Sequence, residues 1–407
     1  MVVRPAATAL DARLADHWDA RLSPLASLAA ELSVLEAEGL RRRRRVLETP
    51  QRAHVTVDGR EYVAFCSNDY LGLAAHRELV DAACEGARRY GIGAGASHLI
   101  LGHMKPHHEL EQALARFVGL PAALLFSSGY MANVGLITAL AGRGDAVFAD
   151  KLNHASLNDA ALLSRAELKR YRHVDLAQLA RLLERSSAKN KFIVSDAVFS
   201  MDGDIAPARE LLELADRYDA WLVLDDAHGF GIIGEGGRGI LEHANIRSSR
   251  IAYMATLGKA AGVYGAFVAG QPELIETLVQ RARTYIYTTA IPPLLAHTLT
   301  RSLELIECGG DRRAHLFALV ATLKAGLQDS GWKLLPSQTA IQPLIVGGTI
   351  DALTLSEQLA ERGLLVPAIR PPTVPRGTAR LRIALSADHQ LGDVERFVGA
   401  LRSLRSP

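Results

Sequence analysis

Cysteine is rare in this sequence, and no two cysteines stand at a spacing typical of a metal site. Cys66, Cys84 and Cys308 are scattered along 407 residues, and no C-x-x-C pair is present. A disulfide framework or a cysteine zinc site therefore has no basis in the sequence. We expect a protein of the reducing cytoplasm with no bound metal.

An excess of charge of one sign is also missing. The chain has 46 Lys and Arg against 44 Asp and Glu, which gives a net charge of +2 and no general reason to expect a nucleic-acid or membrane partner. Residues 1–22 carry charges throughout and no long apolar run, so we expect neither a signal peptide nor a membrane span. The local exception is RRRRR at 41–45, where a solvated helix end and an anion site are both open.

Apolar residues are abundant, at 49% of the sequence, which is enough for two or three compact units. Residues 8–45 have an amphipathic helical pattern broken near Pro24, and an extended piece with an Asp-Gly turn follows. From about 120 to 270, amphipathic helices alternate with short β-rich runs, which read AALLF, DAVFAD, KFIVSDAVF, WLVLDDA and RIAYMA. The alternation predicts an α/β fold with a mostly parallel sheet covered on both faces, to which YGAFVAG adds a further strand.

The pattern of predicted elements changes near residue 292, where two long helical patterns at 293–307 and 312–329 are followed by further strands and helices. We predict an N-terminal helical segment and extended arm at 1–60. A large α/β domain at 61–291 and a smaller α+β domain at 292–407 complete the division.

Ligands of an open parallel sheet bind beyond the carboxyl ends of its strands, so the residues after each β-rich run are candidate site residues. After AALLF, small residues open a helix at Gly129 and Tyr130, whose backbone N–H groups suit a phosphate. The other strand ends supply His154, Ser200, Asp225 and Asp226 with His228, and Thr256 with Lys259. Each signal is weak alone, because a single histidine is more often structural and helix capping would explain one of the two acids.

Lys259 lies in MATLGKAAG, among small and apolar residues where a lysine is costly to bury without a partner. A Walker loop is excluded, because Tyr253 replaces its first glycine and Ala260 follows the lysine. Together the strand ends fit a ligand with a phosphate, a flat ring, a basic ring nitrogen and a carbonyl that Lys259 can attack. Pyridoxal 5′-phosphate has all four, since its aldehyde forms a Schiff base with a lysine amine.

Several motifs occur in the order of a known family: SNDYLGL, SSGYMAN, NHASLNDA, VFSMDGD, LVLDDAHGFGIIGEGGRG, TLGKA and TARLRI. With them the chain resembles the α-oxoamine synthases, which are fold-type I pyridoxal phosphate enzymes of the class II aminotransferase family, from about residue 40 to 390. The resemblance implies a large, mostly parallel sheet domain with a smaller α+β C-terminal domain. It makes Lys259 the Schiff-base lysine that also moves the α-proton, and it implies cofactor contacts for Gly129, Tyr130, His154, Ser200, Asp225, His228 and Thr256. In these roles His154 stacks on the ring and lies beside the substrate, and Asp225 faces the ring nitrogen.

The stretch AIRPPTVPRGTARLRI is similar to one branch of that family. This branch condenses L-alanine with pimeloyl-CoA, or with pimeloyl-carrier protein, to give 8-amino-7-oxononanoate in biotin biosynthesis. The likeness implies that Arg382, aided by Asn68, binds the amino-acid carboxylate. Thr373 and one arginine of the 41–45 run, for which we choose Arg41, would contact the acyl substrate.

Three further residues bear on the substrates and the assembly. Ser97 stands where glycine-specific relatives tend to carry threonine, and its smaller side chain leaves room for the methyl group of alanine. Arg370 is a candidate partner for the distal carboxylate of a pimeloyl chain, with a surface ion pair as an equally open alternative. Thr288 would reach the phosphate in the neighbouring subunit, which implies a homodimer with its active site at the interface.

Three other functions stay open at this point. Another α-oxoamine synthase, such as a glycine C-acetyltransferase or a serine palmitoyltransferase, would keep the cofactor and change the substrates. A non-catalytic binding protein on the same fold would more naturally have lost Lys259 or Asp225, and both are present. A dinucleotide-dependent oxidoreductase would need the G-x-G-x-x-G fingerprint, which is absent after AALLF.

Overall fold

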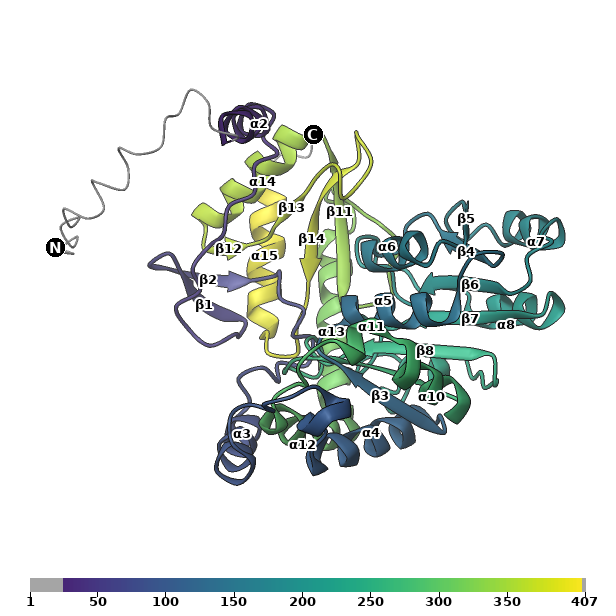
Figure 1. Ribbon diagram of the computed structural model, residues 1–407. Coiled ribbons are helices and arrows are strands. Elements are labelled where there is room, and N and C mark those ends of the chain that lie inside the picture. Colours follow the sequence, from purple (N-terminus) through teal and green to yellow (C-terminus); the bar gives the residue numbers. More distant parts are fainter. Residues whose placement is uncertain (1–24, 405–407) are drawn as a thin grey trace.

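The computed structural model describes residues 25–404 (Figure 1). The part of the expected N-terminal helix that precedes residue 25 lies outside this range. Figure 1 shows a large sheet with its helices on one side of the molecule, and the C-terminal elements with the hairpin of residues 54–64 on the other. Within residues 25–404, none of the helices combines the length and apolar character needed to cross a membrane.

A seven-stranded sheet forms the large part of the molecule, in the order β3-β9-β8-β7-β6-β4-β5. Only β9 runs antiparallel to its neighbours, so the mostly parallel α/β sheet predicted from the sequence is confirmed. The strands are β3 (Ala122–Phe126), β4 (Ala146–Asp150), β5 (Glu167–Tyr171), β6 (Lys191–Asp196), β7 (Ala220–Asp225), β8 (Ile251–Thr256) and β9 (Ala266–Gly270). The sequence pattern does not predict β5, because it is a charged strand at the open edge of the sheet, where lysine and arginine discourage further pairing.

Both faces of this sheet are buried. Side chains of successive residues on a strand point to opposite faces, and on β3 Leu124 joins the apolar cluster of one face while Leu125 joins that of the other. The first face is covered by α5 (Gly129–Leu140), α6 (Ala155–Ser164) and α10 (Pro272–Arg281). The second is covered by α4 (Lys105–Val118), α7 (Leu176–Glu184) and α8 (Ala208–Arg217).

The C-terminal part contains a four-stranded sheet in the order β10-β11-β14-β13. Its strands are β10 (Lys333–Leu334), β11 (Ile341–Gly347), β13 (Ala368–Ile369) and β14 (Ala379–Ala384), and its helices are α13 (Gly310–Leu327), α14 (Thr349–Glu361) and α15 (Leu391–Ser403). Before them, α12 (Pro293–Glu307) packs against α4 and against α3 (Arg77–Tyr90). Shorter elements are the π-helical turn η1 (His98–Gly102), α9 (Ile240–His243) and α11 (Arg283–Ile286).

The N-terminal arm is joined to the C-terminal part by a small sheet. The expected Asp-Gly hairpin forms from β1 (His54–Val57) and β2 (Arg60–Ala64), with Asp58 and Gly59 both at positive φ, as its two-residue turn requires. β2 also pairs in parallel with β12 (Leu364–Leu365). The arm is thus fixed to the same part of the chain that carries Arg370 and Thr373.

The arginine run does not continue the N-terminal helix, contrary to the expectation of a helix through residue 45. Helix α2 spans Leu25–Ala37, and Gly39 follows with a φ of 65°, a left-handed conformation that ends a helix. Residues 41–45 beyond that point have no regular secondary structure. The backbone carbonyl of Arg41 accepts a hydrogen bond from Nη2 of Arg370 at 3.1 Å, which holds the run beside β13.

One ionic contact holds the loop that follows β6. Nδ1 of His173 lies 3.1 Å from Oδ1 of Asp150 at the end of β4, and Nε2 lies 2.8 Å from Oδ2 of Asp204. Burial lowers the pKa of His173, but the hydrogen bonds and charges of the two carboxylates outweigh it and raise the pKa to about 10. A cationic His173 therefore ties the loop that carries Ser200 to the carboxyl edge of the sheet.

Candidate active site

A cavity of about 210 Å³ lies at the carboxyl edge of the large sheet. It brings together all the predicted cofactor residues of one subunit, which come from α5, the strand ends and the loop after β8: Gly129, Tyr130, His154, Ser200, Asp225, His228, Thr256 and Lys259. Its wall also contains residues to which the sequence reasoning gave no role, among them Asn133, Ser156 and Asp196.

Lys259 projects into this cavity from a tight turn. The N–H of Gly262 donates to the carbonyl of Lys259 at 2.8 Å, and a side chain on Gly262, whose φ is 69°, would collide with the backbone of Ala74. Nζ of Lys259 lies 2.9 Å from Nε2 of His228. Burial of the amine lowers the pKa of Lys259 to about 8, while the nearby carboxylate of Asp225 acts in the opposite direction.

The two acids at the end of β7 have different surroundings. Asp225 faces the cavity, where its Oδ2 accepts a hydrogen bond from Nδ2 of Asn133 at 2.7 Å. Asp226 faces away, and its Oδ2 accepts from the N–H of Ile240 and the hydroxyl of Tyr253. Burial raises the pKa of Asp226 to about 8. The geometry therefore leaves Asp225 as the acid that a ligand can reach.

Asp196 ends β6 and is paired in register with Asp225. Burial, together with the neighbouring charge of Asp225, raises the pKa of Asp196, so a proton is retained there more readily than on an exposed acid. The backbone N–H of His154 donates to both oxygens of Asp196, and Nδ1 of His154 lies 2.7 Å from the hydroxyl of Ser156. Burial lowers the pKa of His154, which favours the neutral ring.

A hydrogen-bonded chain connects His228 to Arg382 on β14. The hydroxyl of Tyr70 donates to Oδ1 of Asn68 at 3.1 Å and lies 2.7 Å from Nδ1 of His228. Since that hydroxyl has one proton, Nδ1 of His228 donates to it and Nε2 is left as an acceptor for Nζ of Lys259. Arg382 donates to Asn68, to Tyr70 and to the carbonyl of Ser200. Burial and the charge of Lys259 lower the pKa of His228, in agreement with a neutral ring.

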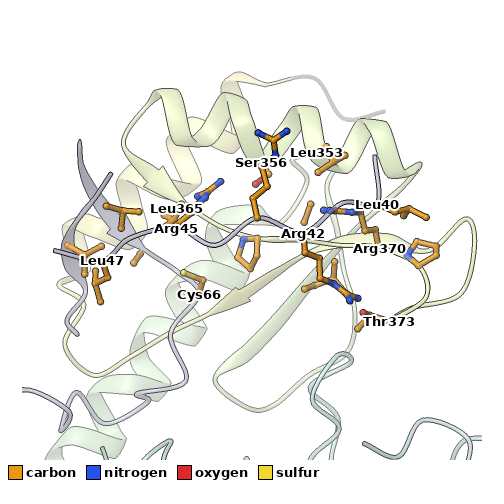
Figure 2. A pocket seen from close by; sticks show the side chains of 18 of the residues that line it. Leu40, Arg42, Arg45, Leu47, Cys66, Leu353, Ser356, Leu365, Arg370 and Thr373 are labelled. Carbon is orange, nitrogen blue, oxygen red and sulfur yellow. The ribbon is translucent and has the colours of Figure 1, made fainter. Parts of the chain in front are cut away.

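A second cavity, of about 560 Å³, lies between the N-terminal arm and the C-terminal part (Figure 2). Its walls are mainly apolar, with arginines and hydroxyls added, and its lining includes Leu40, Leu47, Val55, Leu365, Ile369, Ser356, Arg370 and Thr373. Cys66 lies in this wall, where burial raises the pKa of the thiol while the charges of Arg45 and Arg382 lower it. Arg382 is thus close to both cavities.

The side chain of Arg41 does not line this cavity, and its contact with the acyl substrate stays a prediction. It is turned toward Glu36, with Nη1 at 3.2 Å from Oε2, whereas Arg42, Arg43 and Arg45 line the cavity.

Ser97 and Thr288 line neither cavity. Ser97 precedes η1, and its carbonyl accepts from the N–H of Gly102 at 2.8 Å. Thr288 follows α11 in a partly exposed loop. The expected contact of Thr288 with a neighbouring subunit stays a prediction.

Two residues that the sequence reasoning missed could have been found from spacing. Asn133 lies one helical turn after Gly129, so both residues share the face of α5 that points to the cavity. Asp196 ends the β-rich run before that of Asp225, and adjacent parallel strands bring such ends together. Tyr70 gave no comparable signal, because its contacts depend on how the large and C-terminal parts meet.

The donors in the smaller cavity fit pyridoxal phosphate. The first N–H groups of α5, at Gly129 and Tyr130, have no acceptor within a helix and suit a phosphate. Thr256 adds a hydroxyl, Asp225 a carboxylate for a ring nitrogen, and Lys259 an amine for the aldehyde. Oδ1 of the buried Asn133 has no hydrogen-bond partner among the described residues, so a polar group can still be accommodated beside it.

Comparison with known proteins agrees with this geometry. The family profile described as aminotransferase class I and II matches residues 60–401. The chain belongs to this family, and its cofactor is pyridoxal phosphate. It is 64% identical over 365 residues to the 8-amino-7-oxononanoate synthase of Nitrosospira multiformis, with 90% of this chain and 92% of the relative covered. Within the family, the chain therefore belongs to the 8-amino-7-oxononanoate synthases, as the resemblance predicted.

Two solved structures are similar throughout. A variant of the serine palmitoyltransferase from S. paucimobilis with bound PLP–myriocin matches with a TM-score of 0.88 at 30% identity, covering 94% of this chain and 98% of that one. An 8-amino-7-oxononanoate synthase from Francisella tularensis matches with a TM-score of 0.74 at 30% identity, covering 84% and 97%. The fold is thus shared by relatives whose names indicate different substrates.

The charges around Lys259 predict opposite effects of two substitutions on its pKa. In the cofactor-free protein, Asp225→Asn removes a charge that raises this pKa and should shift it below the value of about 8. Arg382→Gln removes a charge that lowers it and should shift it upward. Competitive acetylation across pH, with Lys259 quantified by mass spectrometry, measures both shifts. Shifts in the same direction, or a wild-type value near the ordinary 10.5, would contradict the electrostatic account.

Proposed function

We propose that the chain condenses L-alanine with a pimeloyl thioester and forms 8-amino-7-oxononanoate, carbon dioxide and the free thiol. A C–C bond forms between Cα of alanine and the thioester carbonyl carbon, and the C–S bond breaks. The bond from Cα to the alanine carboxylate breaks as carbon dioxide leaves, and Cα regains a proton. The observation that carries the proposal is the amine of Lys259 at the carboxyl edge of the sheet, in one cavity with Asp225 and two histidines.

Lys259 is the residue placed to move the proton at Cα. A pKa of about 8 leaves part of the amine neutral near physiological pH, as a general base requires. His228 holds Nζ by its acceptor nitrogen at 2.9 Å and orients it. When bound, the cofactor supplies an electron sink for the carbanion, and Asp225 is the carboxylate suited to keep its ring nitrogen protonated.

Arg382 and Asn68 are suited to bind the carboxylate of alanine. The guanidinium is nearly buried and is held by three hydrogen-bond acceptors, so little side-chain freedom is lost when an anion binds. His154, which lies beyond the end of β4, would stack on the ring of the cofactor. Ser97 lies outside the two cavities, so any selection of alanine by its small side chain would require a contact made in an assembly.

The larger cavity is suited to the acyl chain. A pimeloyl chain is apolar along its length and ends in a carboxylate, and the cavity combines apolar walls with Arg42, Arg45, Arg370 and Thr373 (Figure 2). We propose Arg370 as the partner of that carboxylate and place Thr373 beside the acyl substrate. The donor is pimeloyl-CoA or a pimeloyl-carrier protein. Free thiols at Cys66, Cys84 and Cys308 agree with the proposed cytoplasmic site of action.

The reaction itself is tested by product analysis. Wild-type protein loaded with pyridoxal phosphate should release carbon dioxide from L-alanine and pimeloyl-CoA and form a product with the mass of 8-amino-7-oxononanoate. Lys259→Ala should lose at least about 10³-fold in kcat, because no other group in the cavity replaces its amine. Faster turnover with glycine and acetyl-CoA, or with serine and palmitoyl-CoA, would favour another α-oxoamine synthase instead.

A second experiment tests the acyl cavity separately. Arg370→Gln should raise KM for pimeloyl-CoA roughly 10- to 100-fold, the effect of losing a charge-assisted hydrogen bond, and leave KM for alanine unchanged. Arg376→Gln removes an exposed arginine from the same loop and serves as the matched control. Equal changes in both KM values, or equal effects of both variants, would assign Arg370 a structural role only.

The exposed apolar residues around the site support a homodimer with the active site at its interface. Ile100 and Leu101 in η1 are 80% and 82% exposed, and Tyr130 in α5 and Tyr287 after α11 are also exposed. Helix α11 packs against both η1 and α5, so these side chains come from neighbouring segments. Large apolar side chains gathered on one surface are typical of an interface. Thr288 would then contribute to the site of the partner subunit.

Sedimentation velocity tests the dimer. The wild-type protein should sediment with twice the mass of the 43.9 kDa chain, and the double variant Ile100→Glu with Leu101→Glu should sediment as a monomer with little activity. Leu391→Glu, at an exposed leucine that starts α15, is the control and should remain dimeric. A wild-type monomer with full activity would overturn this part of the proposal.

A further inference from the structure

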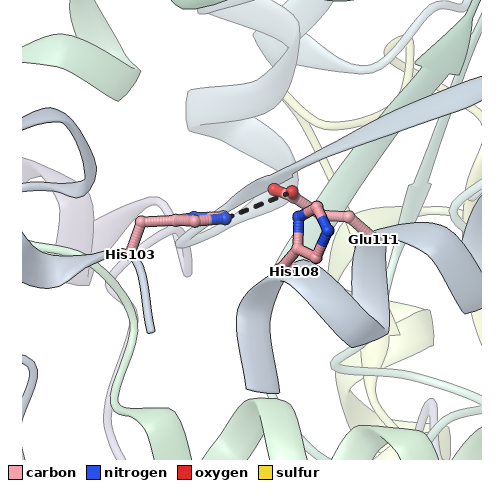
Figure 3. A group of neighbouring side chains, drawn as sticks. All are labelled: His103, His108 and Glu111. Atoms are coloured by element: carbon pink, nitrogen blue, oxygen red, sulfur yellow. Dashed lines mark ion pairs between the residues drawn. The ribbon is translucent and has the colours of Figure 1, made fainter. Parts of the chain in front are cut away.

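Three side chains outside both cavities point toward one another beside the start of α4 (Figure 3). They are His103, His108 and Glu111, and each offers one ligand atom that lies within 4.8 Å of the other two. Nε2 of His103 is 3.8 Å from Oε2 of Glu111. The reaction proposed above makes no use of any of them.

The positions of these side chains follow from the local fold. His108 and Glu111 are three residues apart on α4, so both lie on one helical face. His103 immediately precedes the N-cap residue Met104, whose N–H donates to Nδ1 of His107 at 2.9 Å. Nε2 of the buried His107 in turn lies 2.8 Å from the carbonyl of Ile291. The start of α4 is therefore fixed, and with it the approach of His103 to the helix.

Each of the three side chains also has a neighbour that orients it, as ligands of protein metal sites usually do. Nδ1 of His103 lies 3.1 Å from Nδ1 of His98, which leaves Nε2 of His103 facing Glu111. Oε1 of Glu111 accepts from the N–H of Leu125 at 2.9 Å, which leaves Oε2 facing the histidines. Nε2 of His108 lies 2.9 Å from Nε2 of Gln112, so its Nδ1 is available to an ion.

We propose that His103, His108 and Glu111 form a Zn²⁺ site whose fourth ligand is water. Two imidazoles and one carboxylate suit zinc, whereas Mg²⁺ prefers oxygen ligands throughout. Zinc at about 2.1 Å from each donor needs donor atoms roughly 3.4 Å apart. The ligand atoms lie within 4.8 Å of one another, so the separations exceed this by at most about 1.4 Å. His108 is exposed and able to rotate. Glu111, with its side chain only 12% exposed, would gain a cation as a partner.

The position of the site gives the ion a structural role. His103 directly follows η1, which begins one residue after Ser97, whereas His108 and Glu111 belong to α4. A bound ion would tie the 97–103 segment to the helix. We therefore expect zinc to slow amide hydrogen exchange in this segment.

Isothermal titration of the holoenzyme, purified without an affinity tag, with ZnCl₂ tests the site. We expect one ion per chain with a Kd in the micromolar range or below, and no binding of MgCl₂ under the same conditions. His103→Ala and His108→Ala should each weaken zinc binding at least about 10-fold. His243→Ala removes an exposed histidine on α9 and is the matched control, which should leave the affinity unchanged.

The proposal is wrong if zinc does not bind saturably at concentrations up to 100-fold above the micromolar range. It is also wrong if His103→Ala and His243→Ala lose zinc affinity equally. A second measurement needs no variant. Zinc should protect His103 and His108 of the wild-type protein from diethyl pyrocarbonate, as followed by mass spectrometry, and should leave His243 reactive. Equal modification of His103 with and without zinc would also refute the site, whether or not the condensation reaction proposed above is correct.

Discussion

The site depends on the attraction between the carboxylate of Asp225 and the amine of Lys259. Burial and the charge of Arg382 lower the pKa of the amine, and Asp225 partly restores it. Without burial the pKa of the amine would be higher, and without the carboxylate it would be lower. Asn133 fixes Asp225 by a hydrogen bond of 2.7 Å, so this balance depends on the packing of α5 against the sheet.

A second carboxyl group, that of Asp196, also acts on the amine of Lys259. Parallel strands end in register, and this brings a second acid beside Asp225. Two neighbouring carboxylates do not ionise independently, and the more buried Asp196 is the one whose pKa is raised. The backbone N–H of His154, bound to Asp196, is positioned by the same pair of strands.

Much of the fold and of the smaller cavity could be predicted from the sequence. His154, Asp225 and Thr256 lie at or just after the carboxyl ends of strands. Because the carboxyl ends of parallel strands lie at one edge of a sheet, the sequence predicts that these residues lie close together. Where contacts depend on tertiary packing, the sequence was less informative. Tyr70 reaches His228 only because two parts of the chain meet there, and the spacing of the arginine run does not show which of its members line the larger cavity. The dimer contact of Thr288 depends on a second chain and stays a prediction.

The two cavities have different structural origins, and this difference bears on substrate choice. The smaller cavity is built almost wholly from strand ends and α5, which are parts of a sheet shared with the serine palmitoyltransferase at a TM-score of 0.88. The larger one is built from the N-terminal arm, β2 and the segment 353–373, which meet through β12. The two cavities have no lining residue in common, so substitutions in these segments would alter the larger cavity without replacing Lys259 or Asp225. Arg382 donates to the carbonyl of Ser200, which lines the smaller cavity, and its charge lowers the pKa of Cys66 in the wall of the larger one. The substrates proposed for the two cavities would therefore meet beside this residue of β14.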